Sequence, residues 1–302
     1  MSGGSGQAGA TGALSHEAGE GRGGGRTTFA NRAFPYLLLA PALTVVGAFF
    51  VLPLGFSVAG AFEGEAGPTL DNLRRAFGLY RTDLLFTLVI VAASTALIGL
   101  GAVAIGGYLI LGRSRAAVRI LAAIYRWPLF IPFIVAAQAM RGFIGQNGLM
   151  NNTLIWLGLM PQEWAQSFLD WRGIVFTFVW KQLPFATLLV AGAMAALDRA
   201  GIEAAQNLGA GRMRILLGIV LPQVGRNVMV ALVLSFVTMM SVLSVPLMIS
   251  GQSPTMLTVA MAWRINALGD YGTANALGLV ACIASGLVAW AWLRQSAREA
   301  AR

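Results

Sequence analysis

Long apolar segments, separated by short polar runs, dominate the chain from residue 34 onward. A helix needs about 20 mostly apolar residues to cross the hydrocarbon core of a bilayer. Each such segment must be helical, because unpaired backbone amides and carbonyls find no water to bond in lipid. The pattern therefore predicts an all-α membrane protein with about six transmembrane helices, at residues 34–60, 84–112, 118–140, 173–197, 227–250 and 273–293.

The remaining segments are too polar or too short to cross. Residues 1–31 are rich in Gly, Ser, Ala and Thr and cannot build a core, so they predict a disordered tail. The transmembrane domain then covers residues 32–294, including a polar loop at 198–226, and a short tail follows at 295–302. The partly apolar segment from Leu149 to Met160 has about half the length of a crossing, so it predicts an interfacial or re-entrant helix.

The basic residues give the orientation of the spans. In the six-span topology, fourteen of the 21 Lys and Arg residues fall on the side that holds both termini, and six fall on the other side. Basic residues near membrane spans concentrate in cytoplasmic loops. The bias therefore predicts that both termini are cytoplasmic, and that the chain is a multi-pass protein of a bacterial inner membrane.

Composition excludes several classes of protein. Only 11% of the residues are charged, against about 25% in a soluble domain. The net charge is +9, and the basic residues lie in short runs between the spans. This distribution is typical of residues that set membrane topology, and not of a surface that binds nucleic acid. The only cysteine is Cys282 and the only histidine is His16, so disulfides, metal sites and histidine-based catalysis lack their residues.

The loop at 198–226 has the pattern of two short helices joined by a turn. Its first half places Ile202, Ala205, Leu208 and Gly209 on one apolar face, and its second half does the same with Met213, Leu216, Leu217 and Val220. Gly209 and Gly211 suit a helix C-cap and a sharp turn, and Pro222 is predicted to restart the chain before the fifth span. Such a helical pair needs a cover for its apolar stripe: the membrane surface, the helix ends of the protein itself, or a soluble partner.

The spacing of residues in this loop resembles one known family. Glu203-Ala204-Ala205, three residues, Gly209, nine residues, and Ile219 with Leu221-Pro222 match the loop of form E-A-A-x3-G-x9-I-x-L-P in permeases of binding-protein-dependent ABC importers. The place of the loop, before the penultimate span and on the arginine-rich side, also fits that family.

The resemblance implies a role for the loop. In that family it forms a coupling helix that docks on a cytoplasmic ATPase, so Glu203, Ala204, Ala205, Gly209, Ile219, Leu221 and Pro222 become the predicted coupling residues. It also implies an ATPase dimer, a second permease subunit (a copy or a paralogue) and a periplasmic binding protein as partners. The chain has no phosphate-binding loop of G-x-x-x-x-G-K-[ST] form, so we expect it to bind no cofactor and the partner to use the ATP.

The cargo is encoded weakly. Asn207-Leu208-Gly209-Ala210 resembles the polyamine, phosphonate, iron and thiamine branch of the family, with a sugar-type permease as the alternative. Polar groups are costly inside lipid, so those within spans are predicted to line a pathway: Gln138, Lys181, Gln182 and Ser241. Packing of helix against helix is the competing explanation for the serines.

Two other classes of function compete with an importer permease. A secondary transporter needs repeats between its halves, and none is evident in the sequence. A membrane enzyme needs a cluster of titratable groups at membrane depth, where the spans offer little besides Lys181.

Overall fold

A computed structural model describes residues 39–64 and 67–300 of the chain. It divides into two units, Met1–Gly55 and Phe56–Arg302. The predicted tail at residues 1–31 lies outside the described residues. Within them, five helices are long and apolar enough to cross a membrane: Leu39–Ala61, Asp71–Leu111, Trp171–Ala195, Arg212–Ser241 and Tyr271–Trp292. A bent pair of helical segments supplies a sixth crossing if it is counted as one span.

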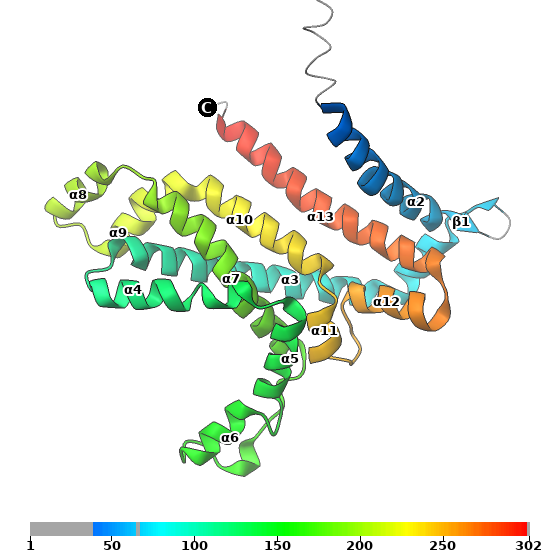
Figure 1. The fold of residues 1–302 in the computed structure, drawn as a ribbon, viewed down its shortest axis with the longest axis horizontal. Helices are drawn as coiled ribbons and strands as arrows, with labels where there is room; N and C mark the ends of the chain where they lie inside the picture. Colours follow the sequence, from blue (N-terminus) through cyan, green and yellow to red (C-terminus); the bar gives the residue numbers. More distant parts are fainter. Residues whose placement is uncertain (1–38, 65–66, 301–302) are drawn as a thin grey trace, which may run out of the picture. The chain divides into compact units, whose positions relative to one another are not determined.

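Helices account for nearly all of the regular structure in these residues. In chain order the elements are η1 (Gly47–Val51), α2 (Leu52–Ala61), β1 (Glu63–Gly64), β2 (Gly67–Pro68), α3 (Asp71–Leu111), α4 (Arg115–Ile124), η2 (Trp127–Phe130), α5 (Phe133–Ile144), α6 (Leu149–Trp156), η3 (Gln162–Trp164), α7 (Trp171–Ala195), α8 (Arg199–Asn207), α9 (Arg212–Ile215), η4 (Leu216–Val220), α10 (Leu221–Ser241), α11 (Ser244–Ile249), α12 (Leu257–Leu268) and α13 (Tyr271–Ala300) (Figure 1). The two short strands pair antiparallel, with Glu63 opposite Pro68.

The main core of the second unit lies where α3, α7 and α10 pack together (Figure 1). Buried apolar side chains from all three helices meet there, among them Ile98, Phe178 and Met239. Small residues allow the close approach: a Cβ on Gly101 of α3 would lie 2.7 Å from a methyl group of Leu183 on α7. Membrane helices commonly pack through such small residues, because lipid supplies no hydrophobic force between them.

The third predicted span, 118–140, is wrong as a straight helix. The chain breaks between η2 and α5, and the segments Arg115–Phe130 and Phe133–Trp156 are bent by 109°. Pro132 stands at the break as the N-cap of α5, and a proline cannot continue the hydrogen bonds of a preceding helix. The separate short helix expected near 149–160 is present as α6. Asn151, only 2% exposed, ties it down by donating to the carbonyls of Gln146 and Gln166 at 2.8 and 2.9 Å.

The fifth predicted span, 227–250, is wrong at both ends. The helix begins fifteen residues earlier, because α9, the π turn η4 and α10 form one helix from Arg212 to Ser241. Pro222 therefore does not restart the chain. The i→i−5 bond from the Leu221 amide to the Leu216 carbonyl changes the hydrogen-bond pattern directly before this proline, which has no amide to donate. Past Ser241 the chain breaks again, and α11 is a separate short helix.

Helix α12, which packs on α13 and on α3, lies outside all six predicted spans. Its Arg264 donates to Tyr80 at 2.7 Å and to the Asp270 carboxylate at 3.0 Å. Burial acts to raise the pKa of Asp270, but hydrogen bonds from Thr273 and the Arg264 charge outweigh it, so this pKa lies below its usual value. The predicted spans at 84–112, 173–197 and 273–293 are confirmed as helices, and α13 continues through Ala300 into the predicted tail.

Candidate functional site

Helix α8 holds the first half of the 198–226 loop, and its start is fixed by a side-chain cap. The Asp198 carboxylate accepts a hydrogen bond from the Ala200 amide at 3.0 Å. The first amides of a helix have no partner within it, and an Asp at this position supplies one. An acidic group there also suits the partial positive charge of the helix N-terminus. The sequence thus defines where α8 begins, with three residues between the end of α7 and its first residue.

The end of α8 is closed by a Schellman turn. Gly209 has φ of +79°, and its amide donates to the Gln206 carbonyl at 2.9 Å. The next amide, of Ala210, reaches back to the Ala205 carbonyl at 2.9 Å. Glycine adopts this left-handed conformation without the steric cost that a Cβ brings. The expectation that Gly209 supplies the C-cap turn is confirmed.

The two faces of α8 differ sharply in exposure. Ile202 is 6% exposed, and Ala205 is half-buried against the core. Glu203 and Ala204 are exposed on the other face, and Leu208 at the tip is 88% exposed. The expectation that Leu208 shares the covered face is therefore wrong, because the helix ends at Asn207 and Leu208 lies in the cap. An acidic, small and apolar surface remains open along one side of the helix.

The second half of the loop is built into the core more deeply than predicted. Ile215, Leu216 and Val220 are buried, whereas Met213 and Leu217 are 67% and 55% exposed. The predicted apolar stripe is thus wrong in part, since the π turn shifts the helical register across this segment. Of the predicted coupling residues here, Ile219 and Leu221 are half-buried and Pro222 is exposed.

Lys181 is a buried cation, with 6% of its surface exposed. Its ammonium group donates to the Leu129 carbonyl at 3.3 Å and lies 5.1 Å from the centre of the Phe133 ring. Both partners flank the break between η2 and α5, so this lysine ties α7 to the bent span. No carboxylate among the described residues lies within ion-pair distance of it.

The other polar residues predicted to line a pathway do not form one cluster. Gln182 is 5% exposed and donates to the Ser235 hydroxyl at 3.4 Å, which joins α7 to α10. Gln138 and Ser241 are exposed, and Ser241 donates to a backbone carbonyl within its own helix at 2.8 Å. Over residues 39–64 and 67–300, no hydrogen bond joins any two of Gln138, Lys181, Gln182 and Ser241. Nor do three His, Cys, Asp or Glu side chains come together there as metal ligands.

These features define a class of protein: a multi-spanning membrane protein with a capped helix–turn–helix between the long helices α7 and α10, ahead of the last span, α13. The model of the family "Binding-protein-dependent transport system inner membrane component" matches residues 102–298. The match covers well over half of the chain. The chain therefore belongs to this family of inner-membrane ABC transporter permeases.

Relatives agree with this assignment, and solved structures share the fold. The chain is 28% identical over 262 residues to the trehalose/maltose transport system permease protein MalF of Thermococcus litoralis, covering 81% of this chain and 87% of the relative. It is 26% identical over 283 residues to the sulfoquinovosyl glycerol transport system permease protein SmoG of Agrobacterium fabrum, covering 87% and 90%. The fold matches a chain of a bacterial alginate ABC transporter with a TM-score of 0.77, at 19% identity and covering 90% and 97%.

The names of the relatives bear on the two cargo classes that the sequence left open. Alongside those two, the chain is 29% identical over 227 residues to the sn-glycerol-3-phosphate transport system permease protein UgpA of Escherichia coli, covering 65% and 70%. These names favour the sugar-type alternative over the polyamine and phosphonate branch. Leu208-Gly209-Ala210 forms a helix cap, whose geometry is independent of what passes through the membrane.

Proposed function

We propose that this chain is the membrane-spanning subunit of an ABC importer for a carbohydrate or a related polyol derivative. The cargoes named for its relatives support the substrate class: trehalose/maltose, sulfoquinovosyl glycerol and sn-glycerol-3-phosphate. The chain alternates between inward-open and outward-open states, and ATP hydrolysis by a separate subunit biases that equilibrium. The chain itself binds no ATP.

The observation that carries the proposal is the shape of α8. Its ends are capped by Asp198 and Gly209, its inner face is anchored by Ile202, and its outer face presents Glu203 and Ala204. In the proposed assembly this outer face and the Leu208 tip dock in a cleft of a cytoplasmic ATPase. Small and apolar groups beside one carboxylate suit close packing with a single polar contact.

The second half of the loop would carry the movement of the ATPase into the membrane. Ile219 and Leu221 pack partly into the core, and Pro222 lies at the junction with α10. A second permease subunit completes the translocation path, and a periplasmic binding protein delivers the cargo to it. Lys181 and Gln182 hold the bent span and α10 against α7, whereas Gln138 and Ser241 remain accessible to the cargo or the second subunit.

The proposal is tested by purifying the tagged full chain from its native membrane in mild detergent and identifying its partners by mass. We expect an ATPase subunit, which then supports ATP-driven uptake of radiolabelled carbohydrates in proteoliposomes that contain the binding protein. Uptake driven by an ion gradient without any ATPase would instead establish a secondary transporter. Exchange of Glu203 for Lys reverses the exposed charge and should release the ATPase, while Glu163→Lys, outside the 198–226 loop, serves as the control.

A further inference from the structure

The break between η2 and α5 interrupts a crossing of the membrane partway along its length. The two segments of the bent span end at Phe130 and begin again at Phe133. Lys181, which contacts this break, lies near the middle of the long helix α7. Polar groups within a span find partners only in the protein itself, in a water-filled path or in a ligand. The polar groups at this break therefore indicate what passes along it.

Helix α5 begins at the break with open backbone amides. No side chain caps its N-terminus, and its first bond runs from the Ala136 amide to the Pro132 carbonyl at 2.9 Å. The amides of Phe133, Ile134 and Val135 consequently have no acceptor among the described residues. Such amides carry the partial positive charge of a helix N-terminus. Pro132, Ile134 and Val135 are exposed, so a molecule outside the chain can reach this end of α5.

A buried cation lies against the same end of α5. The ammonium group of Lys181 is 5.1 Å from the centre of the Phe133 ring, and Phe133 is the first residue of the helix. Side chains of a helix lean toward its N-terminus, so this ring extends toward the open end. An ammonium group has three donors, and the Leu129 carbonyl, at 3.3 Å, is the one acceptor that the described residues offer to Lys181. No carboxylate among them lies within ion-pair distance, so the charge still lacks an anionic partner.

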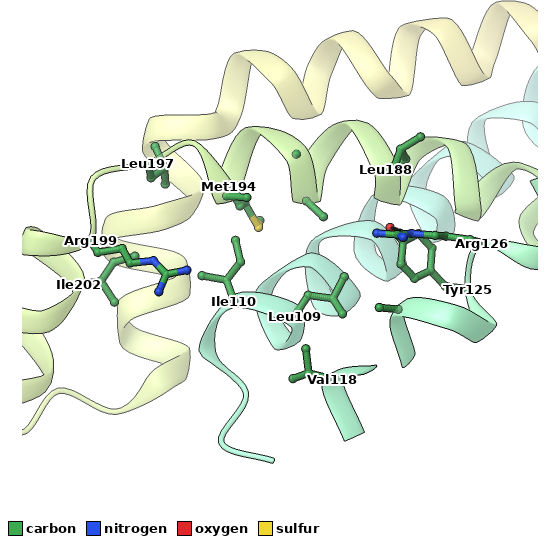
Figure 2. Close-up of a pocket in the computed structure, with 14 residues that line it drawn as sticks. Leu109, Ile110, Val118, Tyr125, Arg126, Leu188, Met194, Leu197, Arg199 and Ile202 are labelled. Carbon is green, nitrogen blue, oxygen red and sulfur yellow. Dashed lines mark hydrogen bonds between the residues drawn. The ribbon is translucent and has the colours of Figure 1, made fainter. Parts of the chain in front are cut away.

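Between the break and the 198–226 loop lies a cavity without acidic groups. It has a volume of about 360 Å³ and is enclosed by the end of α3, helix α4, the last two turns of α7 and the start of α8 (Figure 2). Arg126, three residues before Leu129, lies at one end, and Arg199 lies at the other (Figure 2). No Asp or Glu lines the cavity, and neither arginine forms an ion pair within the described residues. A cleft with charge of one sign attracts ions of the other, so this cavity favours anions.

We propose that the break binds the anionic group of the cargo, which is then a phosphorylated, sulfonated or carboxylated carbohydrate and not a neutral one. The oxyanion accepts hydrogen bonds from the first amides of α5 and from Lys181. Helix N-termini and ammonium groups both bind such oxyanions, and a broken membrane helix can aim its N-terminus at an anionic substrate group. Gln138, exposed one turn along α5 from Ile134, is available to the hydroxyl groups of the same cargo. This inference rests on the proposed function for the carbohydrate class and adds the charge.

The test measures ligand binding to the full chain and needs neither an ATPase nor transport. The chain is placed in nanodiscs of phosphatidylcholine, which has no net charge, and is titrated with glucose 6-phosphate or with glucose while saturation-transfer NMR follows binding. We expect the wild type to bind glucose 6-phosphate about tenfold more tightly than glucose, or better. Lys181→Met should lose that preference by about tenfold, because a charge-assisted contact is lost. Lys181→Arg keeps a cation at the break and should keep most of the preference.

A second pair of variants separates the backbone amide from the side chain. Ile134→Pro and Ile134→Ala both remove the exposed isoleucine side chain, but only proline also removes the amide, and a helix tolerates proline in its first turn. Ile134→Pro should weaken glucose 6-phosphate binding about tenfold with Lys181 intact, and Ile134→Ala should bind like wild type. This pair keeps the test decisive if thermal unfolding shows that Lys181→Met is unstable. Arg119→Met removes an exposed cation of α4 that does not line the cavity, and it should leave binding unchanged.

Other outcomes would refute the inference. Equal affinity of the wild type for the two sugars, or an unchanged preference in Lys181→Met, would mean that the break holds no anion. Inorganic phosphate that binds as tightly as glucose 6-phosphate would make it a site for a soluble ion. Loss of binding in nanodiscs that contain phosphatidylglycerol would assign it to a lipid headgroup. ATP-driven uptake of neutral sugars alone would refute this inference and leave the proposed function standing, whereas a chain that prefers glucose 6-phosphate but recruits no ATPase would do the reverse.

Discussion

Exchange of Gly209 tests whether the outer end of α8 is a contact surface. Its φ of +79° penalises any residue with a Cβ, but an added Cβ would meet no other atom of the chain within 4 Å. Backbone strain is thus the only cost within this chain. For alanine it amounts to about 1–2 kcal/mol, whereas Asn and Asp enter the left-handed region more readily.

Gly209→Asp and Gly209→Asn are therefore a matched pair: their side chains differ in charge, but have nearly the same size and impose nearly the same backbone strain. Neither should unfold the free chain. In a docked turn, however, the aspartate buries an unpaired carboxylate, which costs several kcal/mol in real proteins. A cost of about 3 kcal/mol weakens binding by roughly a hundredfold. The asparagine keeps most of the affinity, because an amide can share hydrogen bonds with a polar partner.

The assay compares how much ATPase subunit co-purifies with each tagged variant, and it needs no knowledge of the cargo. Hydrogen exchange on the free chain checks that α8 stays folded in both variants. We expect near-complete loss of the ATPase with Gly209→Asp and substantial retention with Gly209→Asn. Wild-type recovery of the ATPase with the aspartate variant would refute the idea that this turn docks.

Three further predictions concern the folding of the chain. Asp198→Ala removes the N-cap of α8 and should destabilise that helix by about 1 kcal/mol, so hydrogen exchange of the α8 amides should become about fivefold faster. Asp198→Ser keeps a capping side chain and should keep the protection from exchange. Gly173→Ala in α7 presses a Cβ onto backbone and should cost about 1–3 kcal/mol in thermal unfolding, while Gly192→Ala on the same helix, with open space around it, should not destabilise and should gain about 0.5–1 kcal/mol from helix propensity. The pKa of Asp270 is lowered in the folded chain, so its contribution is complete above the unfolded pKa and is lost as pH falls through the folded pKa. Unfolding measured from pH 7 down to pH 3 should therefore lose less stability in Asp270→Asn than in wild type, and Asp71→Asn, whose ion pair is exposed, should behave like wild type.

The sequence predicted the spans well where hydrophobic length alone decides them. It failed where a crossing bends. Residues 118–140 are as apolar as a straight span, so hydrophobic length alone does not reveal the 109° break at Pro132, beside which Lys181 of α7 donates to the Leu129 carbonyl. Helix α12 was missed because its 12 residues are too few to cross a membrane, so a search for spans passes over it. Arg264 of this helix bonds to Tyr80, which is far away in the sequence, and to Asp270, which lies beyond the turn at the end of α12. No local sequence pattern reveals either pairing.

The candidate site was predictable in its caps and unpredictable in its faces. A glycine after a helical pattern signals a C-cap, as Gly209 does, and an Asp directly before such a pattern signals an N-cap, as Asp198 does. The exposure of Leu208 and Met213 could not be predicted, since one depends on the exact end of α8 and the other on the π turn at Leu216–Val220. The cavity beside Arg199 required the arrangement of four helices, which a single sequence does not encode locally.

The double capping of α8 has a consequence for how fast and how tightly a partner can engage it. Fixing one backbone residue costs about 1–2 kcal/mol of conformational entropy, so ordering the nine residues of this helix costs on the order of 10 kcal/mol. Here the entropy cost of ordering α8 is offset when the chain folds, before any partner binds. A partner therefore binds a helix that is already folded, and association resembles the docking of two preformed surfaces. Most of the free energy of the new contacts then remains available as affinity.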